Sequence, residues 1–280
     1  MIRIIFIPTW KCNFHCPYCD YKTKKLDKGY ELDAFQGMHK EIVKKEPNAF
    51  EWLDVFSRFE PYHLELTGGE PTYYYDINRL LSHIPIGSFW SVTTNLSNIE
   101  PFLKANPKQC VGMTASYHPY AKEPYSNLGW FRDQLMQLRT KGYNPIQVTI
   151  VGYPYNIEKW QEYINFFERD FNVNLMLYFK RGWDWTKHPK LLEKALKFKK
   201  YFHGNKKLSF TPSYFKKCSA GFTSILVNPN GNVYRCYSAF IQGKYYMGNI
   251  FDENFHIYNG EKPCKIGCYF PCDLELAGGE

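Results

Sequence analysis

The chain has 280 residues, 44% of them hydrophobic, which is the composition of a globular protein with one large or two modest domains. No apolar run approaches the roughly 20 residues of a membrane-spanning helix, and the opening run Met1–Pro8 is too short and wrongly flanked for a signal peptide. We therefore expect no membrane partner. The net charge of +8, with a basic run from Lys22 to Lys28, leaves two interpretations open: a field that attracts nucleic acid or an acidic substrate, or an ordinary solvated surface.

Short apolar runs alternate with longer stretches of helical periodicity up to about residue 205. The predicted strands are Ile2–Pro8, His63–Thr67, Phe89–Thr94, Val111–Tyr117, Ile146–Tyr153 and Val173–Phe179. The predicted helices cover residues 33–45, 76–83, 98–105, 127–141, 156–169 and 189–202. The side chains expected to cap helix starts are those of Asp33, Asp76, Asn98, Asn127 and Asn156. Six strand–helix units in series predict an α/β fold with a parallel sheet and right-handed crossovers, short of the eight units of a full barrel.

A different pattern follows residue 205. Two apolar runs, Phe222–Val227 and Val233–Tyr237, flank Asn228–Asn232 and predict a β-hairpin with its turn there. Five cysteines lie in or around this hairpin. We predict two domains, residues 1–205 and residues 206–280, the second built around metal and not around a large apolar core.

Nine cysteines favour metal chemistry over disulfides in a chain without export signals. Cys12, Cys16 and Cys19 form the pattern Cys-x3-Cys-x2-Cys after the first predicted strand. Three thiolates on one short loop can hold three irons of a four-iron cluster and leave the fourth iron open to a small molecule. Zinc is the alternative, although zinc sites favour Cys or His pairs that close a tetrahedron. Because exposed clusters are oxygen-sensitive, we expect a cytoplasmic, low-oxygen setting.

This cysteine pattern, with an aromatic residue before the last cysteine, resembles the radical S-adenosylmethionine (SAM) superfamily. The resemblance implies an open, partial (β/α)6 barrel with the cysteine loop at its mouth. It also implies that SAM chelates the fourth iron of a [4Fe-4S] cluster and is cleaved to a 5′-deoxyadenosyl radical. Tyr18 would then lie against the adenine.

The second predicted strand ends in Thr-Gly-Gly-Glu-Pro, which also matches this superfamily. The resemblance assigns Gly68, Gly69 and Glu70 to the amino group of SAM. Glycines let backbone carbonyls approach closely, and a carboxylate suits an ammonium group.

Later strand ends supply further candidates for SAM binding. Thr94 and Asn95 could bond the ribose hydroxyls or the SAM carboxylate, and Ser116 is a second ribose candidate. The run that includes Val151 could place an apolar edge under the adenine.

Five cysteines near the end of the chain carry the second signal: Cys218, Cys236, Cys264, Cys268 and Cys272. The spacing Gly231-x4-Cys236 resembles the first half of the SPASM/Twitch auxiliary-cluster pattern. A full SPASM domain has seven cysteines and two clusters, so the resemblance implies a Twitch-like β-hairpin and helix domain with one auxiliary [4Fe-4S] cluster. Four ligands suffice, which leaves open which of the last three cysteines is spare. A structural zinc site is the alternative.

These features predict a radical SAM enzyme that abstracts a hydrogen atom from a small-molecule or peptide substrate. An auxiliary cluster that accepts an electron fits dehydrogenation or crosslinking. Four residues beyond strand ends are candidates for substrate contact or proton transfer: His118, Lys180, Arg181 and Asp184. The reducing electron would come from a donor such as flavodoxin or ferredoxin.

Other functions stay open. The positive charge also fits a radical SAM enzyme that modifies tRNA or a nucleotide. The aromatic content of 19% also fits a non-enzymatic zinc or iron–sulfur protein that binds nucleic acid. The closing run Gly278–Glu280 repeats the Gly-Gly-Glu sequence of residues 68–70. This run is either a frayed terminus or a tail that enters the active site.

Overall fold

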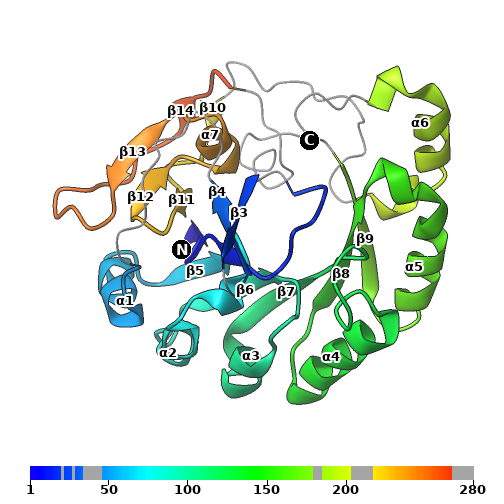
Figure 1. Cartoon of the computed structure of the whole chain (residues 1–280). Coiled ribbons are helices and arrows are strands. Elements are labelled where there is room, and N and C mark those ends of the chain that lie inside the picture. Colours follow the sequence, from blue (N-terminus) through cyan, green and yellow to red (C-terminus); the bar gives the residue numbers. More distant parts are fainter. Residues whose placement is uncertain (20–21, 27–28, 34–45, 179–184, 203–216, 267–280) are drawn as a thin grey trace.

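The computed structural model describes residues 1–19, 22–26, 29–33, 46–178, 185–202 and 217–266. A curved nine-stranded sheet forms the inner layer, and helices line its outer side (Figure 1). This arrangement confirms the predicted α/β class with a partial barrel.

Six parallel strands make up the larger part of the sheet. They are β1 (Ile2–Phe6), β5 (Tyr62–Leu66), β6 (Phe89–Thr94), β7 (Cys110–Tyr117), β8 (Ile146–Gly152) and β9 (Asn172–Leu177). Their order in the sheet follows their order in the chain, and every neighbouring pair is parallel. All six predicted strands are confirmed, with bounds that differ by a few residues at most. The six carboxyl ends therefore meet at one rim.

Helices connect these strands on the outer side of the sheet. They are α1 (Ala49–Ser57), α2 (Ile77–Ser82), α3 (Glu100–Lys104), α4 (Leu128–Lys141), α5 (Trp160–Phe167) and α6 (Pro189–Leu196). Short 3-10 turns cover Pro71–Tyr73, Pro107–Gln109, Pro154–Lys159, Trp185–Lys187 and Lys199–Tyr201. The predicted helix at 33–45 falls mostly outside the described residues, and its expected cap Asp33 is instead the last residue of the strand β4 (Gly29–Asp33).

The predicted caps are confirmed in part. Asn127 caps α4 as predicted, since its side-chain oxygen accepts from the amide of Trp130 at 3.0 Å. Asn98 accepts from the amide of Glu100 at 3.2 Å, but the N-cap position of α3 is Ile99 and not Asn98. Asp76 precedes α2 without capping it, because its carboxylate accepts from the amide of Ala49 at the start of α1. Asn156 lies inside a 3-10 turn, where its amide oxygen accepts from the indole of the first residue of α5. Asp76 is thus occupied by a distant donor, whereas Asn156 is occupied by a side chain only four residues later.

The C-terminal part contains the predicted hairpin. It comprises β10 (Lys217–Cys218), β11 (Ser224–Val227), β12 (Asn232–Tyr234), α7 (Tyr237–Ile241), β13 (Tyr246–Asn249) and β14 (Lys262–Pro263). The side-chain oxygen of Asn228 accepts from the amides of Asn230 and Asn232 and closes the turn. The second strand is shorter than predicted, because Cys236 caps α7 instead of continuing the strand.

The hairpin continues the barrel sheet. β11 pairs in parallel with β1, and β12 and β13 follow in antiparallel pairing, which gives the order β13-β12-β11-β1-β5 at this side. The division into domains at residues 205 and 206 stays a prediction, but strands from both parts share one sheet.

A small three-stranded sheet, which the sequence did not predict, lies beside the barrel strands. β2 (Lys11–Cys12) pairs with β4, and β4 pairs with β3 (Lys22–Leu26), both in antiparallel fashion. Part of the basic run from Lys22 to Lys28 therefore lies on β3.

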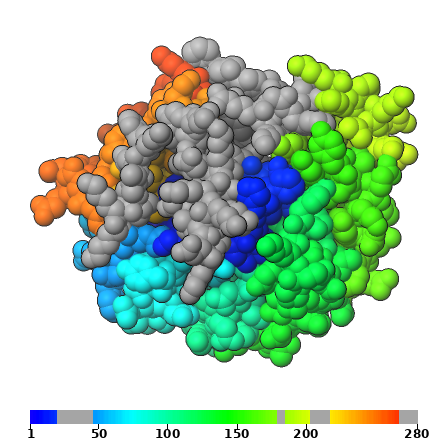
Figure 2. All heavy atoms as spheres, viewed as in Figure 1, coloured from blue at the N-terminus to red at the C-terminus, as the bar shows by residue number. Residues whose placement is uncertain are grey.

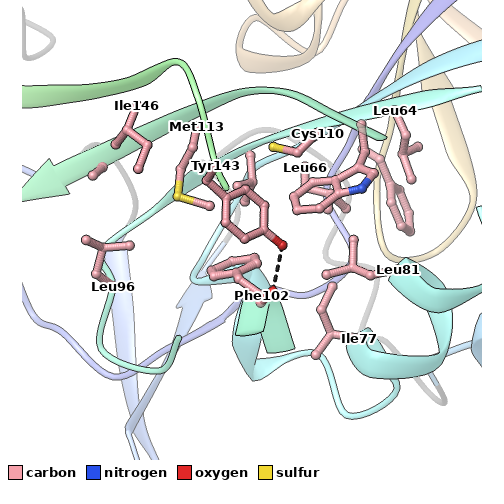
Figure 3. Close-up of a cluster of buried hydrophobic side chains, with 14 of the residues drawn as sticks. Leu64, Leu66, Ile77, Leu81, Leu96, Phe102, Cys110, Met113, Tyr143 and Ile146 are labelled. Atoms are coloured by element: carbon pink, nitrogen blue, oxygen red, sulfur yellow. Dashed lines mark hydrogen bonds between the residues drawn. The ribbon is translucent and has the colours of Figure 1, made fainter. Parts of the chain in front are cut away.

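Apolar side chains from the strands and outer helices form one large core. A section of this core contains Leu64 and Leu66 from β5 and Met113 from β7 (Figure 3). The hydroxyl of Tyr143 donates a hydrogen bond to the carbonyl oxygen of Phe102 at 2.6 Å inside it. In the described part of the chain, no helix has both the length and the apolar character that a membrane crossing requires.

We expect Tyr143→Phe to lower the free energy of unfolding of the metal-free protein by about 1 kcal/mol, because it removes a buried hydrogen bond. Tyr75→Phe is the matched control, since Tyr75 is exposed and its hydroxyl makes a longer bond, 3.4 Å, to the carbonyl of Glu46. Chemical denaturation followed by circular dichroism measures both. Equal losses in the two variants would contradict this assignment.

Candidate iron–sulfur and SAM site

The three N-terminal cysteines lie on the loop that follows β1, at the carboxyl rim of the sheet. Cys12 is on β2, and the amide of Cys19 donates to the carbonyl of Cys16 at 3.0 Å, which closes a turn between the last two thiols. The amide of Phe14 donates to the sulfur of Cys12 at 3.4 Å. In the space-filling view, residues 1–19 (blue) reach the surface beside the green middle part of the chain (Figure 2). The loop is thus held at an accessible rim.

Burial raises the pKa of Cys12 and of Cys16 to about 12, and the charge of the neighbouring thiol of Cys19 adds to this rise. The three sulfurs are therefore close enough to sense one another's charge. Without a metal the thiols of Cys12 and Cys16 stay protonated at neutral pH. A bound cation would make the thiolate forms favourable, so metal loading would release protons.

The donor set fits a cluster better than a single ion. Among the residues that the structure describes, no three or more His, Cys, Asp or Glu side chains converge closely enough for one metal ion. An iron–sulfur cube binds each thiolate to a different iron, so its ligands lie farther apart than those of one zinc ion. None of the seven described cysteines forms a disulfide, so these three sulfurs remain able to bind metal.

Gly68 and Gly69 allow the turn after β5 to lie directly against the start of the cysteine loop. A Cβ atom on Gly69 would lie 2.2 Å from the carbonyl oxygen of Lys11, and one on Gly68 would lie 2.4 Å from the side chain of Ile7. Gly68 also has a φ of +115°, which favours glycine. The amide of Glu70 donates to the carbonyl of Lys11 at 2.8 Å. Both glycines are therefore required by close packing of two backbone segments.

The Glu70 carboxylate is buried and fully engaged within the chain. Thr72 donates to it through its amide and its hydroxyl, at 3.2 and 2.9 Å, and the hydroxyl of Thr94 donates at 2.8 Å. The amide of Asn95 donates to the second carboxylate oxygen at 2.7 Å. Burial raises the pKa of Glu70, and these hydrogen bonds oppose that rise. The carboxylate thus joins the ends of β5 and β6.

Asn95 extends this network to the cysteine loop. Its side-chain amide donates to the side-chain oxygen of Asn13 at 2.9 Å and lies 4.0 Å from the sulfur of Cys12. Its side-chain oxygen accepts from the amide of Ser97. The hydroxyl of Ser97 is buried, and no described residue pairs with it. The sequence did not indicate Ser97.

His118 lies against the cysteine loop. Its Nδ1 is 2.8 Å from the hydroxyl of Tyr18 and 3.3 Å from the sulfur of Cys16, and the rings of Tyr18 and His118 are stacked. Burial lowers the pKa of His118 to about 4, so the ring is neutral at pH 7. The sequence placed His118 at the mouth, and the structure adds its contact with a proposed cluster ligand.

The residues predicted to contact the adenine come together. Tyr18, Val151 and Tyr178 form a buried apolar cluster, with Cys16 and Tyr153 packed against it. The ring of Tyr153 lies 5.5 Å from that of Tyr18 and 5.1 Å from that of Tyr178. This aromatic wall stands beside the cysteine loop. The sequence did not indicate Tyr153 and Tyr178.

Ser116 and three candidate catalytic residues complete the predicted set. Ser116 lies on β7 opposite Thr149 of β8, on the same strand face as His118. Lys180, Arg181 and Asp184 lie outside the described residues.

A second group of cysteines lies in the C-terminal part. Cys218, Cys236 and Cys264 are buried together in one small cluster of side chains. The sulfur of Cys236 accepts from the amide of Ala239, and the thiol of Cys264 donates to the carbonyl of Ile266, both at 3.4 Å. Cys268 and Cys272 lie outside the described residues. Cys110, the isolated cysteine, is buried in the main core and does not belong to this group.

Comparison with known proteins agrees with this geometry. Residues 218–273 match the SPASM family, described as an iron–sulfur cluster-binding domain. The structure of Streptococcus suis SuiB bound to S-adenosylmethionine aligns with a TM-score of 0.58 and 15% identity, covering 90% of this chain and 64% of that chain. The structure of anSMEcpe with bound AdoMet aligns with a TM-score of 0.57 and 15% identity, covering 89% of this chain and 75% of that one.

The chain therefore shares its fold with SuiB and anSMEcpe, and residues 218–273 match a SPASM model, which confirms the predicted resemblance. At these identities the structural likeness concerns the fold. The chain spans less than two thirds of the length of SuiB. A search of curated protein sequences found no match.

We expect Gly69→Ala to displace the cysteine loop, because the new Cβ would overlap the Lys11 carbonyl. The protein should stay folded but lose about four of the roughly eight irons that two cubes supply. Gly112→Ala is the matched control, since Gly112 lies on β7 and a Cβ added there would meet no atom within 4 Å. Iron analysis after anaerobic reconstitution measures the difference. Full iron content in Gly69→Ala would contradict the close-packing argument.

Proposed function

We propose that this chain is a radical SAM enzyme that carries out an oxidative modification, a dehydrogenation or a crosslink, of a peptide substrate. The observation that carries the proposal is the placement at one rim of the loop with Cys12, Cys16 and Cys19, the Gly68–Glu70 turn and the buried cluster of Tyr18 and Val151. The SPASM match to residues 218–273 supports a second cluster. Small molecules remain the other substrate class.

The proposed cofactors are SAM, the [4Fe-4S] cluster held by Cys12, Cys16 and Cys19, and one auxiliary [4Fe-4S] cluster. When bound, the first cluster supplies an electron that cleaves SAM and generates the radical chemistry. For the auxiliary cluster, the candidate ligands within the described residues are Cys218, Cys236 and Cys264. Cys268 and Cys272 are further candidates.

The chain's own residues have distinct tasks in this proposal. Because the Glu70 carboxylate already accepts hydrogen bonds from Thr72, Thr94 and Asn95, we assign it to holding the rim together. Backbone carbonyls near Gly68 and Gly69 are then the acceptors for the ammonium of SAM. The buried hydroxyl of Ser97 is a further donor for a polar group of SAM.

The peptide substrate is supported by the structural neighbours. SuiB has been determined bound to its precursor peptide SuiA, and anSMEcpe with AdoMet and the Kp18Cys peptide. His118, Lys180, Arg181 and Asp184 are proposed for substrate contact or proton transfer, and flavodoxin or ferredoxin as the electron donor.

Anaerobic reconstitution tests the function directly. We expect roughly eight irons per chain, from two cubes, and release of 5′-deoxyadenosine after reduction in the presence of SAM. Replacing Cys12, Cys16 and Cys19 together by alanine should abolish 5′-deoxyadenosine and leave about four irons. Cys110→Ala is the control, because that thiol lies alone in the core.

A colourless protein that binds zinc would contradict the enzyme, and would favour a non-enzymatic metal protein. Cleavage of SAM that is stimulated by tRNA and not by any peptide would favour the nucleotide-modifying alternative.

His118 offers a test that needs no substrate. Because its Nδ1 contacts Tyr18 and Cys16, we expect His118→Asn to slow 5′-deoxyadenosine formation without substrate by roughly fivefold, the equivalent of one lost hydrogen bond of about 1 kcal/mol. Liquid chromatography of the reduced enzyme with SAM measures the rate. A histidine that serves only as a base for the substrate would leave this rate unchanged.

A further inference from the structure

Within the described part of the chain, Arg235 is a buried cation without an acidic partner. The residue follows β12, and only 2% of its surface is exposed. Among the described residues, no carboxylate forms an ion pair with it. Its guanidinium instead donates to four backbone carbonyls, those of Ala220, Cys218, Pro263 and Lys262.

These acceptors belong to the segments that carry the auxiliary cysteines. Arg235 immediately precedes Cys236 in the chain, and it donates to the carbonyl of Cys218 at 2.9 Å. It also donates to the carbonyl of Pro263, directly before Cys264, at 2.9 Å. The guanidinium therefore hydrogen-bonds the backbone at Cys218 and next to Cys264, and Arg235 itself is the residue before Cys236.

The remaining surroundings of the guanidinium are aromatic. The rings of Tyr245 and Tyr258 lie 5.5 and 5.8 Å from its central carbon. Carbonyl dipoles and aromatic faces stabilise a cation, but they carry no net charge. A buried charge that lacks a counter-charge is costly. Cys218, Cys236 and Cys264, bound to metal as thiolates, would supply negative charge at the segments that this guanidinium joins.

We propose that Arg235 is the counter-ion of the auxiliary cluster: its guanidinium, held by the backbone at Cys218 and beside Cys236 and Cys264, balances the negative charge of a thiolate-bound cluster. The inference rests on the proposed function, in which this site holds iron and sulfur. Reduction adds negative charge to a cluster, so a fixed cation beside it raises the reduction potential.

Arg58 provides a matched control elsewhere in the fold. It also donates to backbone carbonyls, those of Val55, Asp252 and Ile250, and it also lies over an aromatic ring. It does not contact the cysteine segments. Arg58→Gln therefore removes an arginine that joins backbone segments without removing a charge from the cluster site.

The test uses the full chain with Cys12, Cys16 and Cys19 replaced by alanine, so that the auxiliary cluster is the one that remains. In this background, Arg235→Lys, Arg235→Gln and Arg58→Gln are compared by iron analysis and by a redox titration with dithionite followed by electron paramagnetic resonance. We expect Arg235→Gln to lower the midpoint potential by about 59 mV or more, a tenfold change in the one-electron equilibrium, or to lose the cluster. Arg235→Lys and Arg58→Gln should keep the iron and a potential near that of the parent.

Equal iron content and equal potentials in Arg235→Lys and Arg235→Gln would overturn the proposal, because charge would then have no role. If circular dichroism shows that Arg235→Gln does not fold, the test rests on Arg235→Lys, which keeps the positive charge. A folded Arg235→Lys variant that binds no cluster would then overturn the proposal. If the parent with native Arg235 binds no iron at this site, the proposed function itself fails, and the inference fails with it.

Discussion

The rest of the site depends on the close backbone contact between the turn after β5 and the loop after β1. The parallel pairing of β1 and β5 does not stop at the strand ends: Thr67 donates to Phe6, Gly69 to Thr9 and Glu70 to Lys11, at 2.9, 3.3 and 2.8 Å. This contact leaves no space for a side chain at Gly69. The start of the cysteine loop is therefore tied to the turn after β5 by backbone hydrogen bonds, and Cys12 follows directly after the last of them, at Lys11.

A buried carboxylate secures that contact from a third strand. Glu70 receives donors from its own turn and from Thr94 and Asn95 at the end of β6, so removing it would leave several buried donors without an acceptor. Asn95 then reaches Asn13 in the cysteine loop. The polar residues at this rim thus form one connected network. Glu70, which the family resemblance assigns to the amino group of SAM, connects three chain segments in the structure.

The sequence allowed accurate prediction where the signal was local. Long apolar runs identified the six parallel strands, and the Asn228–Asn232 turn identified the hairpin, because strand burial and turn closure depend on neighbouring residues. Prediction from the sequence failed where contacts between residues far apart in the chain determine the structure. Asp76 caps no helix because Ala49 competes for its carboxylate, and no local pattern indicated that β11 pairs with β1. In the site, cysteine spacing and the family resemblance predicted Cys12, Cys16, Cys19 and Gly68–Glu70, which the structure brings to one rim. The contact of His118 with Cys16, 102 residues earlier, could not be read from spacing.

The pairing of β11 with β1 also brings the two cysteine sites into one packed unit. Trp10, just before Cys12, stacks on Phe240 of α7 with 5.7 Å between the rings and 8° between their planes. Ile5, Leu226 and Tyr234 complete this apolar cluster, against which Cys12 and Cys19 pack on one side. Cys236 caps α7, so the helix that contacts Trp10 begins at a residue of the second site. Because close-packed interiors adjust little, the separation of the two sites is fixed by core packing and not by a linker. An electron acceptor held in this way would keep a constant position relative to the rim where SAM is proposed to bind, whatever the substrate that enters between them.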